Sequence, residues 1–219
     1  MSAITDRLRA ESADFCAITE YRSRPGLPLR TEFADYHLAE TTPPLNQNGI
    51  FALSRSPLLA SETPKRFTPK SSHRWLVVHV AQADMLALCI HIPNQNEKWN
   101  KDDFWKHVCG FAKRNKSERS IILGDFNTGL DADTENEKFR HSPQFQKLLD
   151  LGWIDCYRAI HGDRREYSWY SPNGNNGYRL DHCFLSAALA TRLRAASFDH
   201  EVRAARLSDH SLLTVDLVG

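Results

Sequence analysis

The sequence predicts an α/β protein, because short apolar runs typical of buried strands alternate with segments of helical periodicity. The clearest strand is residues 121–123, three consecutive apolar residues that end at a glycine. The clearest helix is residues 142–151, with Ser142 expected as N-cap, Pro143 as the first helical residue and Gly152 just past the end. No linker divides the 219 residues, so the sequence favours one domain over two.

The other elements follow from the same two periodicities. Helical spacing predicts helices over residues 4–11, 102–113 and 187–193. Runs rich in β-formers predict strands over residues 15–20, 49–54, 75–80, 85–92, 179–185 and 212–218, of which 75–80 and 85–92 form a hairpin. The strand at 15–20 is expected to be buried. Residues 25–28 read as a Pro/Gly-rich loop, and residues 61–72 as a polar connection or edge.

Composition gives no global argument for a polyanionic partner. The formal net charge is +1, and the hydrophobic content of 41% is ordinary for a globular protein. Local basic clusters at 113–116 and at Arg164 and Arg165 are candidates for binding nucleic acid, although solvated helix and loop faces are the commoner explanation.

Cysteine usage and hydropathy point to a soluble, cytoplasmic protein. The five cysteines show no CxxC pair, which favours reduced core residues over a disulfide framework or a zinc site. No apolar run approaches the roughly 20 residues that a bilayer span requires, so no membrane partner is expected. A monomer is expected.

Acidic and imidazole side chains recur where the predicted strands end. Several carboxylates from separate strand ends suit a hard divalent cation such as Mg²⁺, which prefers oxygen ligands, whereas a structural zinc site would be expected to use cysteine. The residues in this register are Glu20, His91, Asp125, Asp181, Asp209 and His210.

The pair Asp125 and Asn127 follows the strongest strand and has two interpretations. Asp125 can take a proton from water while Asn127 holds that water or a phosphate oxygen. The alternative is an Asx-turn that simply ends the strand.

Four motifs occur in this order along the chain: Ile18-Thr19-Glu20, Gly124-Asp125-Phe126-Asn127, Arg179-Leu180-Asp181-His182 and Ser208-Asp209-His210. Together they resemble the motifs of the endonuclease/exonuclease/phosphatase superfamily, most closely its exonuclease III-like and abasic-site-endonuclease-like branch. The resemblance extends from about residue 4 to residue 218, and the segment His91-Ile92-Pro93-Asn94 is similar to the Tyr-x-Pro segment of that branch.

The resemblance implies a role for each matching residue. Glu20 would bind Mg²⁺, for which Mn²⁺ can substitute, with Asp209 as a further ligand or outer-shell partner. Asp125 would deprotonate the attacking water, which Asn127 would position. Asp181 would fix the tautomer of His210, which would stabilise charge on the phosphate. A carboxylate partner raises the pKa of an imidazole and so favours its charged form.

Five further residues carry weaker assignments. His91 stands where the branch usually carries tyrosine; it could donate to phosphate or be a satisfied core histidine. Trp169 and Tyr170 could stack on a base or sugar, or form an aromatic pair in a core strand. Asn94 and Arg179 are also assigned to substrate binding, although Arg179 with Asp181 could be an ordinary salt-bridged strand end.

For the fold, the resemblance implies a four-layer α/β sandwich of two mixed sheets packed face to face, with helices outside, formed by residues 1–219. It also implies a first strand bearing a Trp-Asn pair ahead of the helix at 4–11, and this strand is expected to be missing. Three explanations stay open: the recorded start is too late, another segment fills the position, or the protein is compromised.

The leading functional prediction is a Mg²⁺-dependent phosphodiesterase that cleaves DNA, as an exonuclease or an abasic-site endonuclease of DNA repair. One alternative is a phosphodiesterase or phosphatase for RNA, a nucleotide or another phosphoester, because one fold supports many substrates. Another is a catalytically weak nucleic-acid-binding protein that lacks the first strand. The short loop at 171–178 leaves little bulk to probe a duplex groove, which argues against abasic-site specificity.

Overall fold

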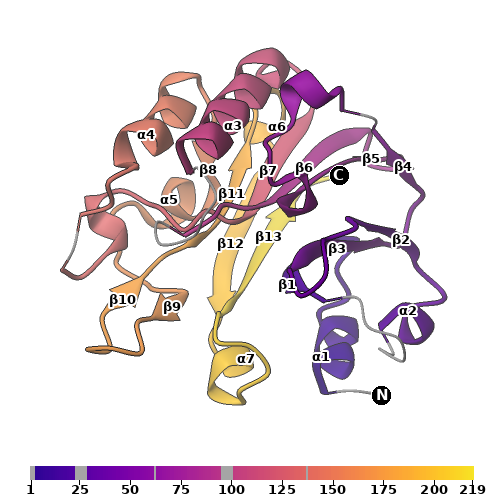
Figure 1. The fold of residues 1–219 in the computed structure, drawn as a ribbon, viewed down its shortest axis with the longest axis horizontal. Coiled ribbons are helices and arrows are strands. Elements are labelled where there is room, and N and C mark those ends of the chain that lie inside the picture. The colour runs from indigo at the N-terminus through magenta and orange to yellow at the C-terminus, as the bar shows by residue number, and fades with distance from the viewer. Residues whose placement is uncertain (1–2, 23–28, 62, 95–100, 137) are drawn as a thin grey trace.

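The computed structural model describes residues 3–22, 29–61, 63–94, 101–136 and 138–219, arranged in layers of sheet and helix (Figure 1). The predicted loop at 25–28 lies outside the described residues. The helices are α1 (Ala3–Glu11), α2 (Leu29–Glu32), α3 (Lys101–Asn115), α4 (Ser142–Asp150), α5 (Cys156–His161), α6 (Ala187–Ala190) and α7 (Glu201–Ala204). The strands are β1 (Phe15–Tyr21), β2 (His37–Glu40), β3 (Gly49–Ser54), β4 (Leu58–Ala60), β5 (Trp75–Val80), β6 (Met85–His91), β7 (Ser120–Asp125), β8 (Ile154–Asp155), β9 (Trp169–Tyr170), β10 (Gly177–Tyr178), β11 (Asp181–Leu185), β12 (Leu193–Asp199) and β13 (Leu212–Leu217).

A six-stranded mixed sheet with the order β4-β5-β6-β7-β11-β8 is the centre of the molecule. Strands β6 and β7 are parallel, and β7 pairs with β11 in the antiparallel sense. One face of this sheet packs against α3 and α4 through a buried aromatic cluster. The rings of this cluster include Phe104, Trp105, Phe126, Phe145 and Phe184.

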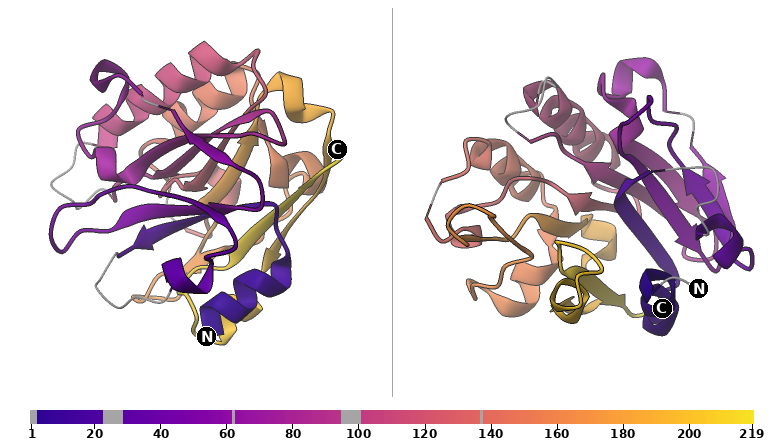
Figure 2. Two further views of the ribbon diagram at one scale, coloured as in Figure 1. Left: turned by 90° about the vertical axis from the view of Figure 1, so that its right-hand side faces the viewer. Right: turned by 60° about the horizontal axis from the view of Figure 1, so that its bottom comes forward.

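The opposite face of the central sheet packs against two smaller sheets, β1-β3-β2 and β12-β13. A third apolar cluster, which includes Leu8, Phe33 and Phe51, joins the outer face of β1-β3-β2 to α1 and to the segment after α2. Figure 2 shows α3 and α4 on one side of the molecule and α1 on the other. The predicted four-layer α/β sandwich is therefore confirmed.

The second layer of strands is divided in two. Within the described residues, β1 pairs with β3 on one side and β13 pairs with β12 on one side, which leaves an unpaired edge on each strand. The consequence is visible in burial: every residue of β3 is buried, whereas most of β1 and β13 are only half-buried. The prediction of a buried strand at 15–20 was therefore wrong.

The structure corrects two other predicted details. His141, rather than Ser142, is the N-cap of α4, and the Ser142 hydroxyl instead donates to the carbonyl of Gly129 at 2.7 Å. The predicted helix at 187–193 ends at Ala190, because Leu193 already begins β12. Of the helices that the structure describes, none is long and apolar enough to cross a membrane.

Candidate active site

Sheet register brings three predicted site residues into one row. Asp125 is the last residue of β7, where it lies opposite His91 at the end of parallel β6 and opposite Asp181 at the start of antiparallel β11. Gly124 permits this register because it has a φ of +133° and a Cβ there would lie 2.0 Å from the carbonyl oxygen of Ile90. The glycine of the Gly-Asp-Phe-Asn motif therefore places the carboxylate that follows it.

Asp125 forms a turn with Asn127 and faces the other acidic groups as well. Its Oδ1 accepts the backbone N–H of Asn127 at 2.7 Å, and its Oδ2 accepts Nδ2 of Asn127 at 3.0 Å. The Asx-turn expected as the alternative is therefore present, but it does not use the whole carboxylate. Burial raises the pKa of Asp125 to about 7, and the carboxylates of Asp181 and Glu20 act in the same direction.

Asn127 is held in a left-handed conformation, with a φ of +47°. Its Nδ2 donates to the carbonyl of Ile92 at 2.9 Å, and its own carbonyl accepts Nζ of Lys101 at 2.6 Å. Burial lowers the pKa of Lys101 to about 8. These contacts fix Asn127 beside Asp125, and no sequence motif pointed to Lys101 because it lies 26 residues upstream.

Asp181 and His210 form a close pair. Nδ1 of His210 lies 2.7 Å from Oδ2 of Asp181, so Nε2 is the nitrogen left for a substrate. Burial alone would lower the pKa of His210, but the Asp181 carboxylate outweighs this effect and raises it to about 10. Burial would raise the pKa of Asp181, and the charge of His210 outweighs it, so that this pKa is lowered.

Ser168, which the sequence analysis missed, joins the segments on either side of this pair. Its hydroxyl accepts the backbone N–H groups of Leu180 at 3.0 Å and Asp181 at 3.3 Å, and its carbonyl accepts the N–H of Ser211 at 2.8 Å. Because Ser211 follows His210 directly, one buried serine fixes the backbone beside both members of the pair.

Glu20 lies at a bulge near the end of β1. The register with β3 shifts between Ile18 and Tyr21, and Glu20 has a φ of +57°. Its carboxylate is 59% exposed, and Oε1 lies 3.4 Å from Nε2 of His91. The bulge therefore turns the side chain of Glu20 towards the row of strand ends.

His91 is buried and neutral. Burial lowers its pKa to about 3, and the charges of Arg74 and His210 act in the same direction. Nε2 lies 3.7 Å from Oδ2 of Asp125, while Nδ1 has no hydrogen-bond partner among the described residues. His91 thus differs from a core histidine whose two ring nitrogens are both hydrogen-bonded within the described part of the chain.

Trp169 and Asp209 lie beside His210. The indole Nε1 donates to Oδ2 of Asp209 at 3.2 Å, and the ring centroids of Trp169 and His210 are 6.3 Å apart. Trp169 and Tyr170 are both half-buried, which contradicts the alternative of an aromatic pair inside the core. Asn94, predicted to bind substrate, is exposed three residues beyond His91.

Arg179 does not lie in the site, so its assignment to substrate binding was wrong. The guanidinium is fully buried, and it donates to Asp133 at 2.8 Å and to both oxygens of Asp155 at 3.0 and 2.8 Å. His182, 3.3 Å from Asp155, completes the cluster as expected of a structural histidine. The motif could not reveal this, because both aspartates lie at least 24 residues away in the chain.

The acidic donor set fits a hard cation held by few protein ligands. Within the described part of the chain, no three carboxylate, imidazole or thiol groups converge into a complete metal site. Mg²⁺ does not need one, because it keeps several waters and usually takes one or two carboxylates. After burial, the charges of Asp181 and Glu20 add to the raised pKa of Asp125, and a cation beside these carboxylates would offset their repulsion.

Comparison with known proteins gives consistent results. Residues 1–210 match the model of the Endonuclease/Exonuclease/phosphatase family. Recombination repair protein 1 of Drosophila melanogaster is 30% identical over 112 residues, a match that covers 43% of this chain and 16% of the Drosophila protein. The chain thus matches less than a fifth of the length of that relative.

Two solved structures share the fold. A 3′ phosphatase from Neisseria, bound to a product DNA hairpin, superposes with a TM-score of 0.83 at 21% identity, over 99% of this chain and 93% of that one. An AP endonuclease from Archaeoglobus fulgidus superposes with a TM-score of 0.83 at 17% identity, with the same shares of each chain covered. The family match over residues 1–210 establishes that this chain belongs to the Endonuclease/Exonuclease/phosphatase family.

Proposed function

We propose that this chain is a Mg²⁺-dependent phosphodiesterase that cleaves DNA, as an exonuclease or an abasic-site endonuclease. The observation that carries the proposal is geometric. A buried carboxylate, Asp125, lies in register with Asp181, which in turn holds Nδ1 of His210 at 2.7 Å. A general base and a charged hydrogen-bond donor are the two groups that hydrolysis of a phosphodiester requires beside the phosphate.

Each residue has a defined task in this proposal. Asp125 removes a proton from the attacking water, and the fixed amide of Asn127 positions that water or a phosphate oxygen. His210 stays protonated because of Asp181, and its Nε2 donates to a phosphoryl oxygen as negative charge develops. The neutral His91 offers Nε2 to the same region.

Enzymes of this family generally depend on a divalent metal ion. Glu20 would hold it, with Asp209 as a second or outer-shell ligand, and Mn²⁺ would substitute for Mg²⁺. When bound, the ion would supply neutralisation of charge on the phosphate oxygens.

Three observations support DNA as the substrate. Two of the similar structures are a 3′ phosphatase bound to a product DNA hairpin and an AP endonuclease. The Drosophila relative is a recombination repair protein. The half-buried indole of Trp169 beside His210 gives an aromatic surface on which a base or sugar can pack.

A substrate panel tests the proposal. Duplex DNA with an abasic site, nicked DNA, single-stranded DNA, RNA and bis(4-nitrophenyl) phosphate are incubated with Mg²⁺ or with EDTA. We expect cleavage of DNA with Mg²⁺, none with EDTA, and a loss of about a hundredfold or more in Asp125→Asn. The exposed Asp163→Asn is the matched control and should retain wild-type activity.

The other outcomes identify the alternatives. Cleavage of RNA or of the small diester, but not of DNA, would assign the site to another phosphoester. Binding of DNA without cleavage of any substrate would indicate a catalytically weak binding protein and overturn the proposal.

A further inference from the structure

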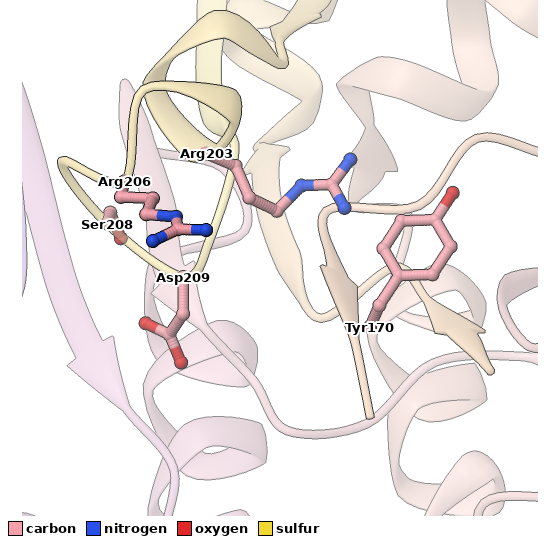
Figure 3. Close-up of a pocket in the computed structure, with 5 residues that line it drawn as sticks. All are labelled: Tyr170, Arg203, Arg206, Ser208 and Asp209. Atoms are coloured by element: carbon pink, nitrogen blue, oxygen red, sulfur yellow. The ribbon is translucent and has the colours of Figure 1, made fainter. Parts of the chain in front are cut away.

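A pocket of about 400 Å³ adjoins the reaction centre, lined by Tyr170, Arg203, Arg206, Ser208 and Asp209. Figure 3 shows Arg203 extended towards Tyr170, with Arg206 and Asp209 on the other side of the pocket. Asp209 precedes His210 and accepts the indole N–H of Trp169, so the wall of the pocket is continuous with the residues around the imidazole.

Arg203 is fixed in position without a carboxylate. Its guanidinium lies 4.4 Å from the ring centroid of Tyr170, and its Nε donates to Oγ of Ser211 at 3.3 Å. Its two terminal NH₂ groups have no hydrogen-bond acceptor among the described residues. This arrangement orients the guanidinium of Arg203 before a ligand binds, and it leaves the terminal NH₂ groups to donate to that ligand.

Arg206 presents a second positive charge from a strained backbone. It is exposed and has a φ of +57°, a region that a long L side chain rarely adopts. The conformation is held by the hydrogen bond from its N–H to the carbonyl of Arg203 at 2.9 Å and by that from Leu207 to Val202 at 3.0 Å. These two hydrogen bonds form a Schellman motif at the end of α7, which fixes the backbone from which the Arg206 side chain extends.

The charge of these two arginines is not balanced locally. Other arginines pair with carboxylates, as Arg7, Arg9 and Arg158 do. No carboxylate within the described ranges comes within ion-pair distance of Arg203 or Arg206, even though Asp209 lines the same pocket. Two oriented guanidinium groups beside a carboxylate-rich centre suit an anion with several oxygens, which arginine binds through two parallel N–H donors.

We propose that this pocket binds the phosphate of the nucleotide next to the scissile one, with Arg206 and Arg203 donating to its oxygens. The inference rests on the proposed function, because it takes the substrate to be a nucleic-acid strand. Tyr170, already oriented by Arg203, then packs against the sugar or base of that nucleotide. The pocket therefore makes the enzyme prefer a polynucleotide to a small phosphodiester.

The first test measures binding without relying on catalysis. Fluorescein-labelled duplex DNA is titrated by anisotropy with Asp125→Asn and with this variant carrying a second change, at several salt concentrations. We expect the added Arg206→Asn to raise Kd about tenfold and to reduce the slope of log Kd against log salt by about one, as the loss of one phosphate contact requires. Asparagine removes the charge but tolerates the left-handed backbone.

Two further variants control this comparison. Arg194→Asn removes an exposed arginine at the far end of β12 and should leave both Kd and the salt slope unchanged. Arg206→Lys restores the charge and should recover most of the affinity. If Arg206→Asn matches Arg194→Asn in both quantities, or if the parent variant does not bind DNA, the proposed phosphate position is wrong.

The second test compares kcat/KM on duplex DNA and on bis(4-nitrophenyl) phosphate in the otherwise unchanged chain. We expect Arg206→Asn to lower kcat/KM on duplex DNA about tenfold relative to kcat/KM on bis(4-nitrophenyl) phosphate. An equal loss on both substrates would overturn the inference, because it would place the effect in the reaction centre or the fold. A wild-type chain that hydrolyses neither substrate would refute the proposed function, while the binding comparison would still decide whether the pocket holds a phosphate.

Discussion

At the scale of single residues, Asp125 combines a structural and a chemical property that oppose each other. The oxygens of its carboxylate close the turn with Asn127, yet burial of this carboxylate raises its pKa to about 7. An unfolded aspartate titrates near pH 4, so the folded state holds an extra proton between about pH 4 and 7. Stability from this group is therefore complete below pH 4 and is lost as the pH rises towards 7.

This linkage gives a prediction for Asp125→Asn. In EDTA, raising the pH from 5 to 8 should increase the denaturant midpoint of the variant relative to that of wild type. The reason is that only wild type must ionise a buried carboxyl over this range. Chemical denaturation followed by tryptophan fluorescence at both pH values measures this. A difference that stays constant across the range would contradict the raised pKa.

His210 gives a second prediction at this scale, because Asp181 is the principal cause of its raised pKa. An imidazolium donor is lost as the pH rises through its pKa, so wild-type kcat/KM should persist towards pH 10. In Asp181→Asn the pKa of His210 should fall towards the ordinary value near 6.5. The alkaline decline in kcat/KM should then move down by two or more pH units, together with the C2–H shift of His210 in an NMR titration. Superimposable profiles would show that the pair does not act in catalysis.

At the scale of elements, the close approach of β6 and β7 depends on Gly124. A Cβ at this position would lie 2.0 Å from the carbonyl oxygen of Ile90, so Gly124→Ala must separate the two strands. We expect a loss of about 3 kcal/mol or more in the free energy of unfolding, as for other severe backbone clashes. Activity should fall as well, because His91 and Asp125 end these strands.

Gly152 is the matched control for that variant. It also has a positive φ, +87°, but a Cβ there would meet nothing within 4 Å. Gly152→Ala should therefore cost only about 1 kcal/mol, the cost of the left-handed conformation itself. Urea denaturation of both variants makes the comparison, and equal losses would contradict the role assigned to strand contact.

The elements that the sequence could predict were those with strong apolar periodicity, such as β6, β7 and α3. Strand β12 was missed because Ala195, Ala196 and the charged Arg194 lack the β-branched signal of a strand. The bulge at Glu20 was invisible for another reason: a positive φ at a glutamate is imposed by its surroundings. The motifs thus located the site residues along the chain, whereas Lys101, Ser168 and Arg206 became visible only through contacts between distant segments.

At the scale of the whole molecule, the buried cluster around Arg179 joins the loop after β7, strand β8 and the entry to β11. The charge of Arg179 outweighs the burial of Asp133 and Asp155 and lowers the pKa of both carboxyls. Carboxyls with lowered pKa values stabilise the fold above about pH 4, and this stabilisation is lost as the pH falls further. We therefore expect this region to become less stable as the pH falls below about 4.

Removal of the guanidinium tests the cluster. Arg179→Met leaves two buried carboxylates without their main partner and should cost about 3–5 kcal/mol in the free energy of unfolding. The acid unfolding midpoint should also move to higher pH. The exposed Arg164, which pairs with Glu166 at 3.7 Å, offers a control, and Arg164→Met should leave the urea and acid midpoints unchanged. If both substitutions have similar effects, the cluster does not stabilise the fold.

The divided second layer of strands has a consequence for the site itself. Glu20 is carried by β1, which packs on β6 and β7, whereas His210 lies two residues before β13, which packs on β11. Neighbouring strands in one sheet are kept about 4.8 Å apart by backbone hydrogen bonds, but no such bonds join β1 to β13 in the described structure. The distance between the carboxylate assigned to the metal and the imidazole assigned to the phosphate therefore depends on side-chain contacts between the two smaller sheets and the helices beside them, such as the ion pair of Arg7 in α1 with Asp199 in β12 at 2.6 Å. The proposed metal ligand and the proposed phosphate donor thus lie in or beside two separate sheets that are joined through side chains rather than through one continuous sheet.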